Sequence, residues 1–159
     1  MNAVTRSTTM SHHSPAPAAS PRTQPPPQAT RVLIVDDEIA MQALTCAIIQ
    51  EMGFEPIAVA TGEEAIEAFR SEAAKGRPMS AVIMDLALPG GMSGLEATDH
   101  LREMDDSVPV IASSGYLQQN ARPAAIERGF SGILPKPYTT ERLMAELRWV
   151  LTQQRQSRN

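Results

Sequence analysis

The chain has 159 residues, of which 42% are hydrophobic and 4% aromatic, and this length suits one domain with short extensions. Residues 31–159 carry all 18 acidic residues and 12 of the 14 basic ones, which argues against nucleic acid as the main partner. No apolar run is long enough to cross a bilayer, and we see no secretory signal. The single cysteine, Cys46, suits a reducing compartment. We therefore expect a cytoplasmic protein with no membrane partner.

Residues 1–30 differ in composition from the rest of the chain. They contain six of the 13 prolines, many Ser, Thr and Ala residues, and no acidic residue. A segment of this kind cannot bury a core, and proline-rich chains favour extended, solvated conformations. We therefore predict a disordered N-terminal tail.

Apolar runs and helical segments alternate after residue 30. Short apolar runs, which predict strands, occur at 31–35, 56–60, 80–85, 108–114 and 131–135. Segments of helical period, which predict helices, cover 39–52, a stretch that opens at 61–64, 94–104, a weaker stretch at about 117–128, and 139 to about 151. This alternation predicts an α/β fold with a doubly wound parallel sheet covered by helices on both faces.

The first and last helices show apolar stripes that predict their buried faces. In the first helix the stripe contains Leu44, Ala47, Ile48 and Met52. In the last helix, residues 143, 147 and 150 are in step, and either Thr139 or Thr140 is placed to cap the N-terminus.

Charged and hydroxyl residues stand at the carboxyl ends of the predicted strands. In open α/β sheets this edge holds the functional site, so we expect these residues to converge: Asp36, Asp37, Asp85, Ser113, Ser114 and Lys136. Neighbouring carboxylates repel one another and are costly to bury, so three acids at the ends of buried strands indicate a bound cation.

The order of these residues resembles that of the response-regulator receiver domain over roughly residues 31–152. The stretches MDLALPGGMSGLEA, IASSGY and GFSGILPKPY are similar to receivers attached to hybrid sensor histidine kinases. The resemblance implies a flavodoxin-like five-stranded sheet in the order 2-1-3-4-5 with five helices. Residues 153–159 are then a short polar C-terminal tail.

The resemblance also implies a role for each residue at the site. Asp85 accepts a phosphoryl group from a histidine kinase or a histidine phosphotransfer protein. Mg²⁺ is bound directly by Asp37 and Asp85, through a water by Asp36, and by the main-chain carbonyl of Ala87. Oxygen ligands of this kind suit a small, hard cation.

Lys136 and one serine complete the expected site. Lys136 supplies a positive point charge to the phosphoryl oxygens. Adjacent strand residues point to opposite faces, so only one of Ser113 and Ser114 can face the site. In the family the switch hydroxyl directly precedes a small residue, and because Gly115 follows Ser114 we select Ser114.

Two further features come from the resemblance. Lys136-Pro137 is expected to be a cis peptide bond. Many receivers carry an aromatic switch residue three positions before the lysine, and this chain has Ile133 there. Tyr116 and Tyr138 are the candidates for a related role.

The expected output is a change of binding surface rather than turnover of a separate substrate. The face formed by the fourth helix, fifth strand and fifth helix should contact a downstream protein or a second copy of the chain. Two alternatives remain. One is an aspartyl-phosphate phosphatase of the haloacid-dehalogenase type, which needs an acid at the position of Ala87, and the other is a receiver that binds partners without phosphorylation.

Overall fold

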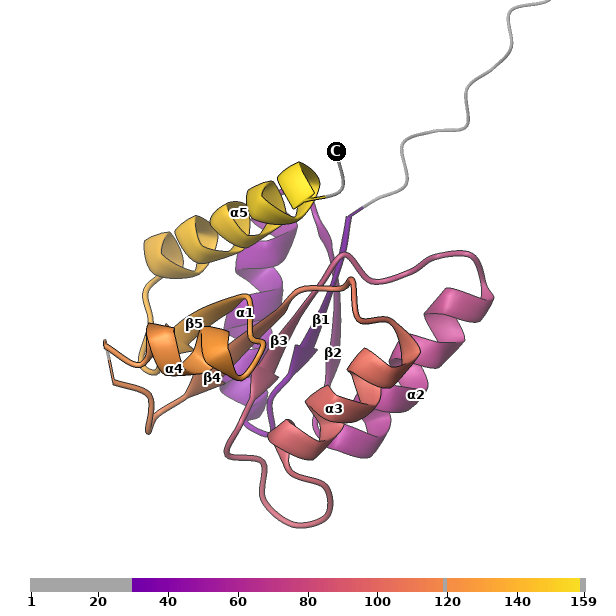
Figure 1. The fold of residues 1–159 in the computed structure, drawn as a ribbon, viewed down its shortest axis with the longest axis horizontal. Coiled ribbons are helices and arrows are strands. Elements are labelled where there is room, and N and C mark those ends of the chain that lie inside the picture. The colour runs from indigo at the N-terminus through magenta and orange to yellow at the C-terminus, as the bar shows by residue number, and fades with distance from the viewer. Residues whose placement is uncertain (1–29, 119, 158–159) are drawn as a thin grey trace, which may run out of the picture.

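The structure, a computed structural model, describes residues 30–118 and 120–157. The predicted disorder of the N-terminal tail concerns residues that lie, apart from Thr30, outside this part of the chain. Strands and helices alternate through the described residues (Figure 1). The strands are β1 Arg31–Val35, β2 Glu55–Val59, β3 Ala81–Asp85, β4 Val110–Ser114 and β5 Gly132–Pro135; the helices are α1 Ile39–Glu51, α2 Gly62–Ala74, α3 Gly94–Met104, α4 Arg122–Glu127 and α5 Thr140–Ser157.

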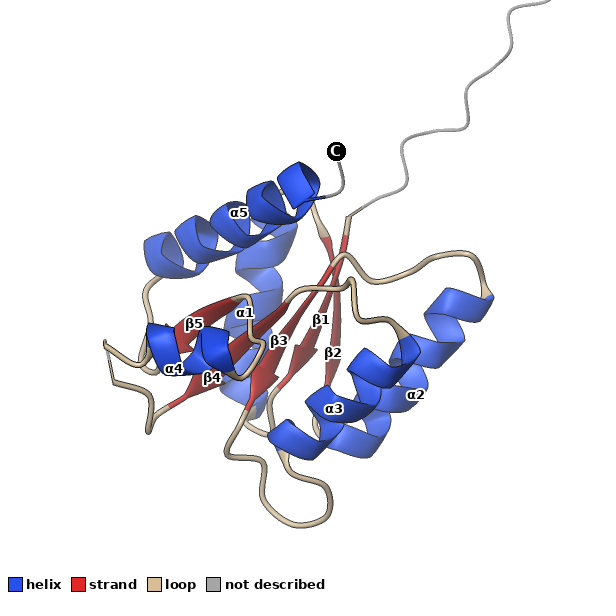
Figure 2. Ribbon diagram, viewed as in Figure 1, coloured by secondary structure: helices blue, strands red, loops and turns tan. Residues whose placement is uncertain are grey.

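The five strands form one parallel sheet in the order β2-β1-β3-β4-β5. This confirms the predicted doubly wound α/β fold and its strand order. All strand arrows point the same way, so their carboxyl ends meet at one edge of the sheet (Figure 2). The sheet order reverses between β1 and β3, and in folds of this type the functional site forms at that point.

Two apolar layers cover the sheet. The helices α1 and α5 pack on one face, against side chains such as Ile34, Ile83 and Leu134. The helices α2, α3 and α4 pack on the other face, around Leu33 and Met84. Every residue of β1, β3 and β4 is buried, as the continuous apolar runs predicted for strands covered on both sides.

Side-chain caps fix where three of the helices begin. Thr61 accepts a hydrogen bond from the amide of Glu64 at the start of α2. Ser93 and Glu96 form a reciprocal capping box at the start of α3. At α5 the hydroxyl of Thr139 accepts from the amide of Arg142, so Thr139 is the cap of the two threonines considered.

The predicted buried stripe of α1 was partly wrong. The structure buries Thr45, Ile48 and Ile49, while Leu44 is 46% exposed and Ala47 is also exposed. The reason is that α1 carries apolar residues around most of its circumference. The periodicity of the sequence therefore did not single out one face, and packing against the sheet and α5 decided it. For α5 the predicted residues Leu143, Leu147 and Val150 are buried, as expected.

Two helix boundaries also differ from the prediction. α4 begins at Arg122 rather than near residue 117, with Pro123 in its first turn, where a proline costs no helical hydrogen bond. α5 continues to Ser157, so residues 153–157, predicted to belong to a polar tail, are helical. Gln154 anchors this last part, because its side-chain amide donates to the carbonyl of Ser107 at 2.7 Å.

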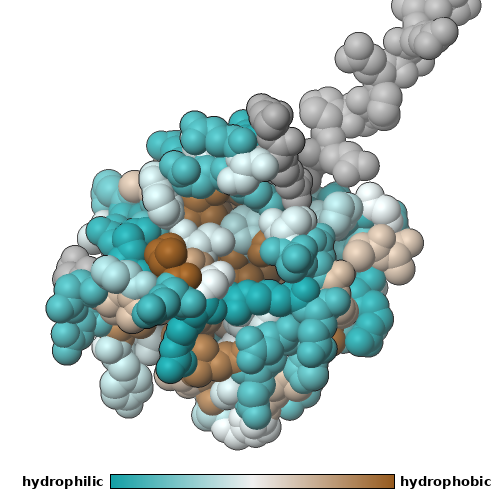
Figure 3. Space-filling model, in the orientation of Figure 1, coloured by the Kyte–Doolittle hydropathy of each residue, from teal (hydrophilic) through white to brown (hydrophobic). Residues whose placement is uncertain are grey.

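Within the described ranges, no helix combines the length and the apolar character that a membrane span requires. On the face drawn in Figure 3, apolar side chains appear only in small separate areas among hydrophilic ones.

Gly94, the first residue of α3, brings this helix against the end of β3. A Cβ atom at this position would overlap the main-chain carbonyl of Asp85 and crowd the Cα of Leu86. The neighbouring atoms belong to the backbone and cannot rotate away. The absence of a side chain at Gly94 therefore allows the first turn of α3 to pack closely against the main chain of Asp85.

We expect Gly94→Ala to lower the free energy of unfolding by about 1–3 kcal/mol, the usual cost of overpacking. Urea denaturation of the variant and the wild type measures this change. Gly115→Ala is the matched control, because a Cβ atom added there would meet nothing within 4 Å and its backbone is not in the left-handed region. Equal stability of the Gly94 variant and the wild type would contradict the close contact.

Candidate functional site

Three acidic residues meet at the carboxyl edge of the sheet, as the sequence predicted. Asp36 follows β1 and Asp85 ends β3, and both are 4% exposed, while Asp37 lies exposed beside them. One carboxylate oxygen from each residue lies within 4.8 Å of the others. A cluster of oxygen donors at this spacing fits a small, hard divalent cation.

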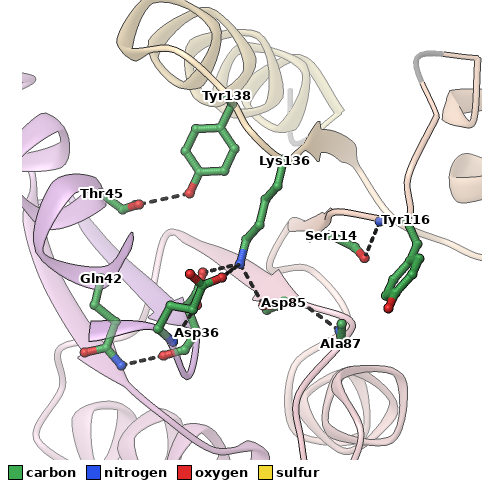
Figure 4. Close-up of polar contacts among 10 residues, drawn as sticks. Asp36, Gln42, Thr45, Asp85, Ala87, Ser114, Tyr116, Lys136 and Tyr138 are labelled. Carbon is green, nitrogen blue, oxygen red and sulfur yellow. Dashed lines mark hydrogen bonds and ion pairs between the residues drawn. The ribbon is translucent and has the colours of Figure 1, made fainter. Parts of the chain in front are cut away.

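Lys136 reaches this cluster from the end of β5 (Figure 4). Its Nζ lies 2.7 Å from Asp36 Oδ2 and 2.8 Å from Asp85 Oδ2, and Glu38 Oε1 is 3.7 Å away. Burial acts to lower the pKa of Lys136, but the hydrogen bonds and charges of Asp36 and Asp85 outweigh it and raise the pKa above its ordinary value. The lysine therefore carries a full positive charge at neutral pH.

Main-chain amides fix the other oxygen of each buried carboxylate. The amide of Glu38 donates to Asp36 Oδ1 at 2.9 Å, and the amide of Ala87 donates to Asp85 Oδ1 at 2.8 Å. The side chain of Gln42 also donates to the carbonyl of Asp36 at 2.6 Å. These bonds orient both carboxylates toward Lys136. The amide of Ala87 thus has a role that sequence reasoning, which assigned only its carbonyl, did not identify.

Asp37 differs from the two buried acids. Among the described residues its carboxylate has no hydrogen bond and no ion pair, whereas Asp36 is held by both Lys136 and the amide of Glu38. The carboxylate of Asp37 is therefore the one most available to bind a cation directly. The predicted roles of Asp37 as a direct ligand and of Asp36 as an indirect one stay predictions.

The two serines at the end of β4 lie in different surroundings. By strand alternation Ser114 is on the same face as Ala112, and its hydroxyl accepts from the amide of Tyr116 at 3.1 Å. Ser113 is on the face of Ile111, and its hydroxyl is buried without a hydrogen-bond partner in the described chain. Ser114 directly precedes Gly115 and Tyr116, which lie beside the acidic cluster, and it remains our candidate for the switch hydroxyl.

The segment around Lys136 contains one confirmed expectation and one feature that the sequence did not reveal. The Lys136-Pro137 bond is cis, as expected. Tyr138 places its hydroxyl 2.9 Å from that of Thr45 on α1. Tyr116, the other candidate aromatic, is 89% exposed. The only sequence signal for Thr45 was a hydroxyl residue within an apolar helix.

An open pocket of about 580 Å³ lies over the acidic cluster. Residues in or beside four strand-to-helix connections line it: Asp37, Glu38, Met41, Asp85, Ala87, Gly115, Tyr116, Lys136 and Pro137. The pocket therefore gives a group from outside the molecule access to the carboxylate of Asp85.

Comparison with known proteins agrees with this geometry. Residues 32–148 match the family model described as the response regulator receiver domain. The chain is 31% identical to the alkaline phosphatase synthesis transcriptional regulatory protein SphR of Synechococcus elongatus, over 85% of this chain and 51% of that protein. It is 33% identical to the sensor protein GacS of Pseudomonas syringae pv. syringae, over 77% of this chain and 14% of that protein. The chain thus spans about half the length of the first relative and a small part of the second.

Solved structures show the same fold. NtrX from Brucella abortus superimposes with a TM-score of 0.72 at 26% identity, covering 82% of this chain and 28% of that one. The chemotaxis protein CheY4 from Vibrio cholerae superimposes with a TM-score of 0.65 at 27% identity, covering 77% of this chain and 98% of that one.

We expect Asp37→Ala to weaken Mg²⁺ binding more than Asp36→Ala does. Loss of an outer partner of a metal costs about tenfold or more in affinity, and loss of a direct ligand should cost more than that. Calorimetric titration of each variant with Mg²⁺ measures both effects, with Asp106→Ala as a control far from the site. The opposite order would refute the assignment of direct and indirect ligands.

Proposed function

Because this chain belongs to the response regulator receiver domain family, we propose that it accepts a phosphoryl group on Asp85 from a histidine kinase or a histidine phosphotransfer protein. The observation that carries this proposal is the setting of the Asp85 carboxylate. This carboxylate is buried and borders an open pocket. One of its oxygens faces the ammonium of Lys136, and the other accepts a hydrogen bond from the main-chain amide of Ala87.

In the proposed reaction a carboxylate oxygen of Asp85 attacks the phosphorus of a phosphohistidine. The new O–P bond forms as the P–N bond breaks, and the histidine leaves with the bonding electron pair. Such transfers pass through a loose transition state, so the protein contributes mainly positioning and charge neutralisation. The amide of Ala87 orients the nucleophile, and Lys136 places a positive charge where the phosphoryl oxygens arrive.

The acidic cluster also fits Mg²⁺ in this reaction. When bound, the cation would neutralise negative charge on the phosphoryl oxygens. Asp37 and Asp85 would bind it directly, Asp36 through a water, and Ala87 through its carbonyl. Asp36 meanwhile holds Lys136 beside the nucleophile.

We further propose that the chain is a phosphoacceptor rather than an enzyme that turns over a separate substrate. An aspartyl-phosphate phosphatase would need a second acid two residues after the nucleophile. Ala87 occupies that position and has no ionisable group.

The proposed output surface consists of α4, β5 and α5. Lys136 follows β5, and Ser114 ends β4 shortly before α4, so a phosphoryl group that attracts both residues would act on this surface. Its elements are linked through Glu146 of α5, which accepts from Arg122 of α4 at 2.6 Å and from the amide of Ile133 in β5 at 2.9 Å. A downstream protein or a second copy of the chain would recognise the changed surface.

We expect Asp85→Asn to abolish labelling by acetyl phosphate in the presence of Mg²⁺, because the amide lacks the nucleophilic carboxylate. Intact-protein mass spectrometry detects the added phosphoryl group, and its removal by hydroxylamine identifies an acyl phosphate. Asp106→Asn, which changes an exposed acid outside the cluster, should label as the wild type does. Equal labelling of the Asp85 variant would show that the nucleophile is another residue.

We expect beryllofluoride with Mg²⁺ to shift amide signals throughout residues 114–138. A group bound at Asp85 changes the contacts of Ser114 and Lys136, and only such differential contacts can move a two-state surface. Two-dimensional NMR spectra report the shifts, and light scattering reports any change in self-association. The Asp85→Asn variant is the control without a response. Shifts confined to Asp36, Asp37 and Asp85 would contradict signalling through this surface.

A further inference from the structure

A buried pair of hydroxyls lies between α1 and the connection from β5 to α5. Thr45, in the middle of α1, is 1% exposed, and its Oγ1 is 2.9 Å from the hydroxyl of Tyr138 (Figure 4). A threonine inside a helix commonly donates to the carbonyl four residues earlier. Thr98 and Thr152 do so in this chain. Thr45 instead bonds a residue that is far away in the sequence.

This hydrogen bond joins the two segments that form the charged site. α1 begins directly after Asp36, Asp37 and Glu38, so Thr45 belongs to the rigid element that follows the acids. Tyr138 follows Lys136 by two residues, within the connection to α5. The link therefore fixes the main chain near Lys136 relative to the helix that carries the acidic loop.

Packing holds the ring of Tyr138 in place independently of its hydroxyl. The ring contacts the apolar layer between the sheet and the helices α1 and α5, the layer that includes Ile48 and Leu143. Removing the hydroxyl alone should therefore leave the ring in position. The effect of the hydrogen bond can thus be separated from that of the ring.

The Tyr138 hydroxyl is also within the electrostatic reach of the site. Burial is the largest influence and raises its pKa, the bond to Thr45 lowers it, and the charges of Asp36, Lys136 and Asp85 act on it as well. The hydroxyl therefore stays protonated at neutral pH and keeps a proton to share with Thr45.

We propose that Tyr138 and Thr45 are positioning residues for Lys136 in phosphoryl transfer, and this proposal rests on the proposed function. The lysine side chain is long and flexible, so the place of its Nζ depends on where its main chain is held. The Thr45–Tyr138 bond holds that main chain so that Nζ lies between Asp36 and Asp85. Ile133, at the position of the family's aromatic switch, has an apolar side chain and cannot provide such a polar link.

The proposal predicts an effect on the chemical step rather than on donor binding. Lys136 acts on charge that develops as the phosphoryl group is transferred, so a displaced Nζ should lower the maximal rate and leave the apparent KM for the donor nearly unchanged. A hydrogen bond of ordinary strength corresponds to a factor of about five to ten in rate.

The test compares four variants and one control variant in labelling by acetyl phosphate with Mg²⁺. We expect Tyr138→Phe and Thr45→Val to lower the maximal rate by about five- to tenfold, and Thr45→Ser, which keeps the hydroxyl, to restore it. The double variant Tyr138→Phe with Thr45→Val should be no slower than either single variant, because both remove the same bond. Thr98→Val is the matched control and should label at the wild-type rate, because Thr98 is a buried helical threonine whose hydroxyl bonds the carbonyl of Gly94 within its own helix. Urea denaturation confirms that each variant is folded.

Three results would overturn the proposal: a wild-type rate in Tyr138→Phe, a changed KM with an unchanged maximal rate, or additive losses in the double variant. A second readout needs no phosphoryl group. The ¹³Cε signal of Lys136 should move in Tyr138→Phe and Thr45→Val but not in Thr98→Val, and an unmoved signal in the first two variants would also overturn the proposal. If the wild type takes no label while the Lys136 signal responds as expected, the proposed function fails and the positioning of Lys136 stands.

Discussion

The ammonium of Lys136 lies between two buried carboxylates, and the arrangement of the site depends on this contact. Placing a single ion in a protein interior costs several kcal/mol even after relaxation, about as much as many domains gain in total from folding. Asp36 and Asp85 are both buried, and each directs one oxygen at Lys136 and the other at a main-chain amide. Lys136 thus offsets part of the negative charge of the two acids, and the remaining negative charge favours a further cation at these strand ends.

Under the proposed function, the same contact would also respond to an arriving phosphoryl group. Lys136 stabilises the two acids only while it remains between them, and an incoming phosphoryl group would compete for its charge. The main chain that carries the lysine joins β5 to α5, and β5 is joined through Glu146 to both α4 and α5. The main chain beside Lys136 is thereby connected to the surface formed by α4, β5 and α5. Residue 133 is Ile rather than an aromatic residue, and Tyr138 is hydrogen-bonded to Thr45 of α1.

Much of the fold could be predicted from the order of residues. Continuous apolar runs identified the strands, because a strand covered on both faces is apolar along its whole length. Thr139 or Thr140 was predicted to cap the last helix, and Thr139 does so, because its hydroxyl satisfies an amide that has no helical partner. The prediction was weaker where periodicity carries little information. In α1, apolar residues surround the helix axis, so the periodicity did not reveal that Thr45 is buried. At the end of α5, Gln154 is anchored by the carbonyl of Ser107, which lies in a loop distant in the sequence.

For the site, the sequence by itself determined which residue types stand at the strand ends. Because the predicted strands are parallel, their carboxyl ends meet at one edge of the sheet, and this rule together with the family pattern indicated that the residues converge. Only the tertiary structure decided which atoms meet. It showed that Lys136 bridges Asp36 and Asp85 while the described residues give Asp37 no partner, that the amide of Ala87 holds the carboxylate of Asp85, and that Tyr138 bonds Thr45. The physical reason is that these contacts join residues from separate strands and helices. Local sequence sets the conformation of each element, but the distances between elements are set by how their side chains pack together.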